Sequence, residues 1–468
     1  MYFNSNEKEK IVIIGGNVSG LAAASQARRN TPDAEITVLE SGNYISYGTC
    51  GLPYYISGVI DDINKLFVYT PRFFEKERKI NIKLNHKVIS INPSKREISV
   101  QVGINKEPSI FNYDKLVICS GATSFDLGIE VSKLKNAFFF RNVEDTLRLK
   151  EFINSYNPKK AVIIGAGSIG LLMAEALLKS GIKVSVIEKA KKIFNEYEDE
   201  ISTILYKKLI LEGIELILEA ELTSALPDDN GFVKNVSFMK DSNLNTLETD
   251  LIILCAGIKA NTDFCKGTSI ELGKSSAIRV SPKLQTSYSN IFAAGDCACV
   301  KNLITGKYDF IPTANNAAKT GRIAGDNITG GDVIFPGSVG TKVDQLFGFE
   351  IAKTGITLKE AHELQFDALK ITENYSSHAK AMPGAQVITV TLIFDKKTRK
   401  VLGAQMISKE GVAKRIDVFA TAVTNQMSID NVYMLDLSYS PGTSTVWDPV
   451  NKICGQAILN LSKIKFYF

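Results

Sequence analysis

One segment of the chain could place a cysteine thiol where it reacts. Cys50 stands in the run from Tyr44 to Gly58 (YISYGTCGLPYYISG), where glycines surround it and a helix is expected to begin near Pro53. A thiol at a helix N-terminus has a stabilised thiolate, so its pKa falls and its nucleophilicity at neutral pH rises. The segment therefore predicts a reactive cysteine. The alternative is a small buried side chain with no chemical role.

The other cysteines do not form a metal-binding pattern. The chain has seven cysteines and three histidines. No two cysteine pairs have the spacing of a zinc site and the histidines are far apart, so we expect no metal centre. Cys297 and Cys299 form a C-x-C among small residues, which favours buried side chains.

A glycine turn in the second quarter of the chain has the pattern of a nucleotide site. Gly165, Gly167 and Gly170 follow an apolar strand and open a helix, and Glu188 ends the next predicted strand. Such a turn brings a pyrophosphate to the helix N-terminus, while the acid accepts hydrogen bonds from ribose hydroxyls. Glu188 would repel a 2′-phosphate, which favours NADH, although Lys189 beside it could offset this and leaves NADPH possible.

The start of the chain repeats this unit. Gly15, Gly16 and Gly20 lie between an apolar strand and a helix, and Glu40 ends the following strand. Asn17 stands where the middle glycine usually is. The chain therefore contains two predicted dinucleotide-binding units, of which the first departs from the usual pattern.

A third element supports the first unit. The apolar run of residues 289–298 ends in Gly295 and Asp296, which places a carboxylate at the C-terminal end of a strand, where ligands bind in open α/β sheets. Asp296 could also cap a following helix. Two further strands end in similar runs, Cys119–Gly121 and Cys255–Gly257.

Length and composition agree with an ordinary globular protein of several domains. The 468 residues are 45% hydrophobic and 22% charged, with a net charge of +5, which gives no reason to expect nucleic-acid binding. No run of 18 apolar residues predicts a membrane span, and the polar N-terminus resembles no signal peptide, so we expect a cytoplasmic protein. Continuous Val/Ile strands indicate buried parallel sheets, and alternating strands after about residue 336 indicate a separate α+β domain.

Together these elements resemble the FAD/NAD-linked pyridine nucleotide-disulfide oxidoreductases over nearly the whole chain. The resemblance implies an α/β fold with two Rossmann-like dinucleotide-binding domains and a C-terminal α+β dimerisation domain. It places the FAD-binding domain at residues 1–125 and 258–332, the NAD(P)H-binding domain at 126–257, and the dimerisation domain at 333–468. The protein is thus expected to be a homodimer.

The same resemblance implies which loops bind which nucleotide. FAD is expected on the first glycine loop with Glu40, Gly121 and the Gly295-Asp296 element. The nicotinamide nucleotide, NADH or NADPH, is expected on the second glycine loop with Glu188 and Gly257.

The family also implies how Cys50 is used. Members with two cysteines carry C-x4-C, but the second position here is Tyr55, so Cys50 must react with an external thiol, persulfide or oxygen. Peroxidase and oxidase members keep a histidine where Val18 stands. The run Cys50-Gly-Leu-Pro-Tyr54 instead matches the C-x-L-P-Y motif of coenzyme A-disulfide reductase and the similar NADH-dependent persulfide reductases.

Other positions match that subfamily in part. Tyr439 matches a tyrosine that reaches the partner subunit's active site, where a phenol could protonate a leaving thiolate. Ala381 and Met382 stand where a second active-site tyrosine is expected, Ala318 replaces a polar residue, and Ala22 and Thr49 also differ. Four residues match in type the positions that contact coenzyme A: Gln26, Arg29, Ser46 and Arg78.

Three functions follow as hypotheses. The first is an FAD-dependent NAD(P)H reductase of low-molecular-weight disulfides or persulfides, with coenzyme A-disulfide as the first substrate to try and a mixed disulfide on Cys50. The second is an NADH oxidase that reduces oxygen through flavin and Cys50. The third is a redox-sensing or electron-carrier flavoprotein.

Overall fold

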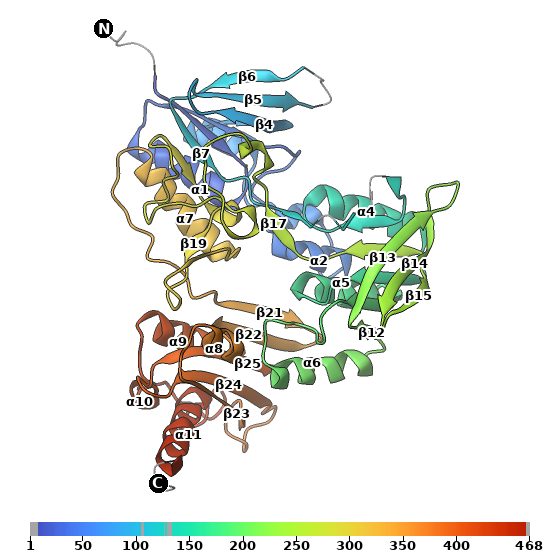
Figure 1. Ribbon diagram of the computed structural model, residues 1–468, viewed down its shortest axis with the longest axis vertical. Helices are drawn as coiled ribbons and strands as arrows, with labels where there is room; N and C mark the ends of the chain where they lie inside the picture. The colour runs from blue at the N-terminus through green and yellow to red at the C-terminus, as the bar shows by residue number, and fades with distance from the viewer. Residues whose placement is uncertain (1–7, 104–106, 126, 129–132, 465–468) are drawn as a thin grey trace.

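The chain folds into three domains, seen in a computed structural model that describes residues 8–103, 107–125, 127–128 and 133–464. In Figure 1 the blue and yellow segments form the first domain, the green segments the second, and the orange and red segments the third. The predicted domain boundary at residue 126 lies outside the described residues. No described helix is long and apolar enough to cross a membrane.

The first domain is built on a five-stranded parallel sheet. Its strand order is β18-β7-β1-β2-β3, and an antiparallel sheet of β4, β5 and β6 accompanies it. Buried Ile, Val and Leu side chains fill the central strands, which is typical of a parallel sheet. The elements are β1 (Lys10–Ile14), α1 (Val18–Asn30), β2 (Glu35–Leu39), α2 (Leu52–Ile56), α3 (Pro71–Arg78), β3 (Asn81–Lys83), β4 (His86–Asn92), β5 (Glu97–Val102), β6 (Ser109–Asn112), β7 (Lys115–Ile118), β18 (Ile291–Ala293), β19 (Val300–Lys301), β20 (Tyr308–Asp309) and α7 (Ala314–Asn327).

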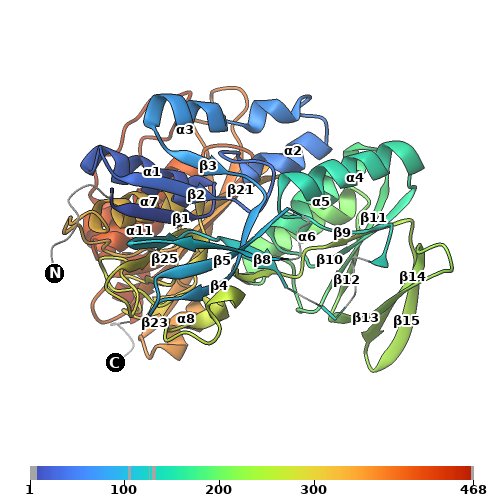
Figure 2. The ribbon, with the colours of Figure 1, turned by 90° about the horizontal axis from the view of Figure 1, so that it is seen from above.

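The second domain repeats this plan. Its parallel sheet has the order β12-β11-β10-β16-β9, again with a three-stranded antiparallel sheet beside it. Figure 2 places that smaller sheet at the outer edge of the molecule. The elements are β9 (Ala137–Phe139), α4 (Val143–Tyr156), β10 (Lys160–Ile164), α5 (Ser168–Lys179), β11 (Lys183–Glu188), α6 (Asp199–Leu211), β12 (Glu215–Leu218), β13 (Ala220–Pro227), β14 (Val233–Lys240), β15 (Asn243–Glu248) and β16 (Leu251–Leu254).

The third domain has the predicted α+β character. Five antiparallel strands in the order β21-β22-β25-β24-β23 pack against helices through a core that includes Phe394, Ile416 and Phe419. The α/β fold class with two dinucleotide-binding domains and a C-terminal domain is therefore confirmed. The elements are β21 (Lys342–Leu346), β22 (Phe349–Gly355), α8 (Leu358–Glu363), β23 (Ala368–Ser376), β24 (Val387–Asp395), β25 (Val401–Ser408), α9 (Val412–Thr424), α10 (Ile429–Tyr433) and α11 (Pro449–Ile464).

Two short strands connect the first and second domains. The chain leaves the first domain through β8 (Ala122–Ser124) and returns through β17 (Ile258–Ala260). These strands pair antiparallel, with Ala122 opposite Ala260. The entrance and exit of the second domain therefore lie side by side.

Glycines bring helix α7 unusually close to α1. A Cβ on Gly321 would lie 2.2 Å from the Ser19 carbonyl oxygen, and one on Gly325 would lie 2.3 Å from that of Ala23. Only glycine allows this approach of two backbones. The contact joins residues that are some 300 positions apart in the chain and fixes α7 behind the first glycine loop.

Candidate active site between the domains

The first glycine loop is a tight strand-to-helix turn. Gly15 has a φ of 108°, which favours glycine, and a Cβ there would lie 2.2 Å from the Cys119 carbonyl oxygen. A Cβ on Gly20 would lie 1.8 Å from the Gly15 carbonyl oxygen. The Gly16 amide donates a hydrogen bond of 2.7 Å to the carboxylate of Glu40. The loop thus presents the N-terminus of α1 beside the predicted ribose-binding acid.

The second glycine loop has the same construction. Gly165 has a φ of 107°, and a Cβ on Gly170 would lie 2.0 Å from the Gly165 carbonyl oxygen. The Ala166 amide donates to Glu188 at 2.6 Å. A Cβ on Gly167 would meet no heavy atom within 4 Å. Space is therefore open beside Gly167, at the position predicted for a phosphate.

Gly295 and Asp296 lie at the C-terminal end of β18, in the short helical turn η6 (Gly295–Cys297). A Cβ on Gly295 would lie 2.4 Å from Ser19 Oγ, so this turn packs directly onto the first glycine loop. The alternative that Asp296 caps the next helix is wrong, because α7 is capped by Thr313. Asp296 instead forms an ion pair with Arg141 at 2.9 Å.

The residues of both loops fit dinucleotides. The N-caps of α1 and α5 make no side-chain capping bond, which leaves backbone N–H groups for a phosphate. The Asn17 side-chain oxygen is buried at the first loop and has no hydrogen-bond partner among the described residues. An unpaired buried acceptor is costly, and a ligand hydroxyl would satisfy it. Asn17 therefore suits the position that a glycine usually fills.

The Cys50 loop is fastened to the first glycine loop by two hydrogen bonds. The Ser46 amide donates to the Gly16 carbonyl at 3.1 Å. The Asn17 side-chain amide donates to Thr49 Oγ1 at 3.5 Å. The residue just before Cys50 thus touches the residue that opens α1, and the thiol lies beside the predicted FAD site.

Cys50 is the exposed thiol of the protein. It lies in the three-residue turn η1 (Thr49–Gly51) that leads into α2. The loop packs on Leu66, whose carbonyl accepts from the Gly48 amide at 2.9 Å and whose side chain would lie 2.3 Å from a Cβ on Gly51. The other six cysteines, all in the described part of the chain, are buried or half-buried, as predicted for Cys297 and Cys299.

The prediction that the pKa of the Cys50 thiol is lowered is wrong. Although part of Cys50 is exposed, the surrounding protein raises its pKa, first by burial and then through the negative charges of Asp344 and Asp296. Arg141 opposes this effect. Helix α2 has five residues, so its N-terminus contributes little charge stabilisation.

Asp344 was not found from the sequence. It lies on β21 of the third domain, and its carboxylate accepts a hydrogen bond of 2.8 Å from Ser168 Oγ, the first residue of α5. Burial raises its pKa. Asp344 therefore connects the third domain to the second glycine loop, and its charge acts on Cys50, so that all three domains meet here.

Three of the four predicted substrate residues gather on α1 and α3. Arg29 donates to the Gln26 side chain at 2.9 Å, and Arg78 donates to Ser25 Oγ. The Arg78 guanidinium also lies 5.9 Å from the ring centre of Tyr69. The cluster presents two cations on the surface of the first domain.

The fourth residue, Ser46, lies between this cluster and Cys50. Ser46 is buried with a φ of 54°, and its carbonyl accepts from the Val68 amide at 2.8 Å. Val68 and Tyr69 are exposed. A surface strip therefore runs from the Cys50 loop through Val68 and Tyr69 to Arg78.

Tyr439 does not lie beside Cys50 of the same chain. It is 49% exposed in the segment between α10 and α11. In Figure 1 these helices lie at the foot of the third domain, well away from α2, where the Cys50 loop ends. Any role of Tyr439 at Cys50 requires a second copy of the chain.

Two adjacent nucleotide-binding domains, with a cysteine loop fixed to the first, define an NAD(P)H-dependent flavoprotein oxidoreductase. The chain belongs to the pyridine nucleotide-disulphide oxidoreductase family, whose model matches residues 9–321. The family's dimerisation-domain model matches residues 346–449. Membership implies FAD and NAD(P)H as cofactors and a dimer as the assembly.

Similar proteins are named for two activities, reduction of persulfides or coenzyme A disulfides and oxidation of NADH. The chain is 32% identical to the NAD(P)H coenzyme A polysulfide/persulfide reductase of Pyrococcus horikoshii, over 95% of this chain and 97% of that protein. It is 31% identical to an NADH oxidase of Methanocaldococcus jannaschii, over 97% and 99% of the two chains. The structure of reduced Bacillus anthracis CoADR-RHD superimposes with a TM-score of 0.92 at 33% identity, covering 98% of this chain and 81% of that one.

Proposed function

We propose that the protein is an NADH-dependent reductase of low-molecular-weight disulfides or persulfides, with coenzyme A-disulfide as the leading substrate. One observation carries the proposal: the exposed thiol, Cys50, lies on a loop hydrogen-bonded to the first glycine loop, and Tyr55 occupies the place of a second cysteine. A thiol in this position has no internal partner and is open to a small external one.

Cys50 would act as the nucleophile. Its thiolate attacks one sulfur of the disulfide, so that a Cys50 mixed disulfide forms and one thiolate leaves. FAD, when bound on the first glycine loop, supplies the electron transfer from the nicotinamide nucleotide to sulfur. Two electrons then cleave the mixed disulfide, which releases the second thiolate and restores that of Cys50. The phenol of Tyr439 from a second copy can give its proton to the leaving thiolate.

The strip from Cys50 to Arg78 supports a phosphorylated thiol as the leaving group. Arg29 and Arg78 are cations suited to phosphate, and Tyr69 offers an aromatic face beside them. The substrate's disulfide would sit at Cys50 while its phosphates reach α1 and α3. Ala318, which is exposed on α7, offers no polar group to a bound coenzyme A. Other low-molecular-weight thiols therefore remain candidate substrates.

NADH is the proposed electron donor. Both carboxylate oxygens of Glu188 accept backbone amides, from Ala166 at 2.6 Å and Ala190 at 2.7 Å, so the acid is held in place. Lys189 pairs with Glu221 at 2.7 Å and so offers less charge to a 2′-phosphate. NADPH is expected to bind more weakly for this reason.

The proposal is tested by NADH oxidation under argon. Wild-type protein should consume NADH when coenzyme A-disulfide or a coenzyme A persulfide is added. Cys50→Ser should lose at least about 100-fold of this turnover, because the nucleophile is gone, while NADH still reduces the flavin. A Cys50→Ser protein with full disulfide turnover would refute the proposal. Cys265→Ser provides a control at a buried thiol outside both glycine loops.

NADH oxidation by oxygen is the second candidate, favoured by the similarity to an NADH oxidase. Val18, 41% exposed at the start of α1, has no imidazole to assist peroxide chemistry. Oxygen-dependent turnover should therefore be slower than turnover with the disulfide. Air-saturated buffer without disulfide, compared with disulfide under argon, separates the two activities.

A further inference from the structure

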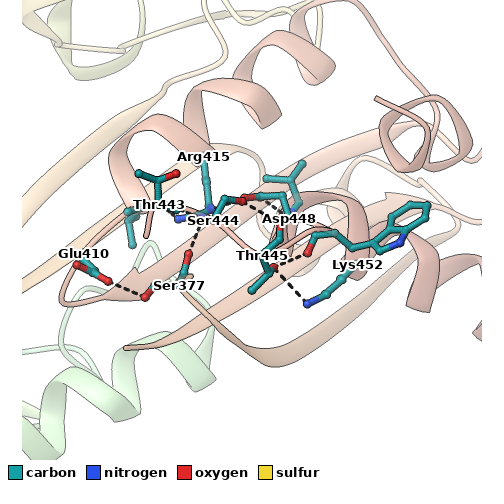
Figure 3. Close-up of polar contacts among 12 residues, drawn as sticks. Ser377, Glu410, Arg415, Thr443, Ser444, Thr445, Asp448 and Lys452 are labelled. Carbon is teal, nitrogen blue, oxygen red and sulfur yellow. Dashed lines mark hydrogen bonds and ion pairs between the residues drawn. The ribbon is translucent and has the colours of Figure 1, made fainter. Parts of the chain in front are cut away.

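A buried arginine organises the region around Tyr439. Arg415, on α9, is 8% exposed and pairs with Asp448, which is 7% exposed, at 2.8 Å. Its two terminal nitrogens donate to backbone carbonyls, those of Gly411 at 2.9 Å, Ser377 at 2.8 Å and Thr443 at 3.4 Å. Figure 3 shows the guanidinium between the Ser377 loop on one side and the Thr443–Asp448 segment on the other. Only the planar fork of arginine reaches so many acceptors at once.

Two of these carbonyl acceptors, those of Ser377 and Thr443, belong to two segments that lie together. Ser377 starts the loop of residues 377–386, which contains Ala381 and Met382. Thr443 belongs to the segment of residues 434–448, which contains Tyr439. The Ala379 amide donates to the Pro441 carbonyl at 3.1 Å, so the segments also touch directly. Arg415 bonds to both segments from beneath, whereas Glu410, which accepts from Ser377 Oγ at 2.6 Å, contacts the first of them.

The far end of the Tyr439 segment is fixed by other contacts. Asp448 accepts from Ser444 Oγ at 3.0 Å and from the Val450 amide at 3.0 Å, at the start of α11. Trp447 stacks on Tyr433 with ring centres 5.0 Å apart. Residues 438–443 are exposed. The Thr443 and Ser444 amides close a turn on the Ser440 carbonyl, and the bonds to Arg415 and Ala379 tie this turn to the rest of the domain.

We propose that Arg415, with Asp448, is a positioning residue that sets the place of Tyr439 for the Cys50 site of a second copy of the chain. The inference rests on the proposed function of Tyr439 as a proton donor. Arg415 lies beneath the surface and acts on the reaction through the segment that it holds. In the neighbouring loop, Ala381 and Met382 stand where a second active-site tyrosine is expected. Tyr439 is therefore the remaining tyrosine expected to act as a proton donor.

Arg415→Lys tests the proposal, because lysine keeps the charge and loses the fork. Amide hydrogen exchange should become faster in residues 377–386 and 438–448 and stay unchanged in β24 and β25. Turnover with coenzyme A-disulfide should fall about tenfold in kcat, with the KM for NADH and the rate of flavin reduction by NADH unchanged. Arg399→Lys is the matched control, since Arg399 forms a bidentate pair with Asp430 in the same domain.

The combined effect of Arg415→Lys and Tyr439→Phe on kcat distinguishes a positioning role of Arg415 from a role in general stability. In a Tyr439→Phe background, Arg415→Lys should reduce kcat by less than about twofold, since both changes remove the same contribution. An equal loss in both backgrounds, unchanged exchange in the two segments, or a parallel loss of flavin reduction would overturn the inference. Ser444→Ala removes one bond to Asp448 and should give a smaller exchange effect in the same segments if Arg415→Lys does not fold.

The exchange measurement also distinguishes this inference from the proposed function. A protein without disulfide or persulfide turnover would refute the proposed function, and the exchange pattern would still decide whether Arg415 holds the Tyr439 segment. Full turnover in Tyr439→Phe would overturn the positioning role at the reaction while leaving the reductase activity intact.

Discussion

Gly167→Ala separates nucleotide binding from folding at the second glycine loop. Gly167 has φ of −86° and ψ of −175°, which alanine also adopts, and its Cβ would meet no heavy atom within 4 Å. The free energy of unfolding should therefore stay the same or rise by about 0.4–1 kcal/mol. The pyrophosphate of NADH should approach at this position, where a methyl group would hold it away from the helix N-terminus. We expect the Kd for NADH to rise about 10- to 100-fold, or about 1.4–2.8 kcal/mol.

The assay is the NADH dependence of flavin reduction under argon, with thermal unfolding measured on the same preparations. Gly170→Ala is the contrasting variant: its Cβ would lie 2.0 Å from the Gly165 carbonyl oxygen, so the loop must shift by more than about 1 Å and stability should fall as well. An unchanged Kd for NADH in Gly167→Ala would show that no phosphate approaches there. A loss of stability equal to that of Gly170→Ala would refute the open space at Gly167.

Three further predictions concern Cys50 and the substrate. Asp344→Asn should lower the pKa of Cys50, because Asp344 has the largest effect among the charges that raise this pKa. Burial raises the pKa more than any charge does, and it is unchanged in this variant. Iodoacetamide should then alkylate Cys50 at pH 7.5 about two- to fivefold faster than in wild type, and an equal rate would contradict the electrostatic argument. In the wild-type protein the alkylation rate should keep rising with pH beyond the range of an ordinary thiol, since the thiolate forms at higher pH. Arg78→Met should raise the KM for coenzyme A-disulfide about tenfold and leave the KM for cystine, which has no phosphate, unchanged. Arg72→Met on the same helix should change neither KM. An equal effect of Arg78→Met on both substrates would contradict a phosphate contact.

The glycine loops were predictable because they are local. Their pattern depends on backbone turns within a few residues, so Gly15, Gly20, Gly165 and Gly170 could be placed without knowing which distant segments they meet. The same reasoning placed the start of a helix near Pro53, where α2 begins at Leu52.

Contacts between distant segments could not be predicted in this way. Asp344 and Arg141 affect Cys50 from other domains, and the sequence around each has no chemical signature. The expected low pKa of Cys50 was wrong for the same reason, since burial and distant charges outweigh a short helix. Asp296 was placed at the correct strand end, but its ion pair with Arg141 depends on how the second domain packs.

The paired strands β8 and β17 make the second domain an insertion with adjacent ends. Ala122 and Ala260 lie opposite each other in an antiparallel pair, where Cα atoms are about 4.5–5.5 Å apart. The parallel sheet on either side of the insertion, with β7 before it and β18 after it, continues without a gap. The first domain is thus closed in space although it is divided in sequence, because the two ends of the insertion meet. Modules with such neighbouring ends can be gained, lost or exchanged without rebuilding the sheet that carries them.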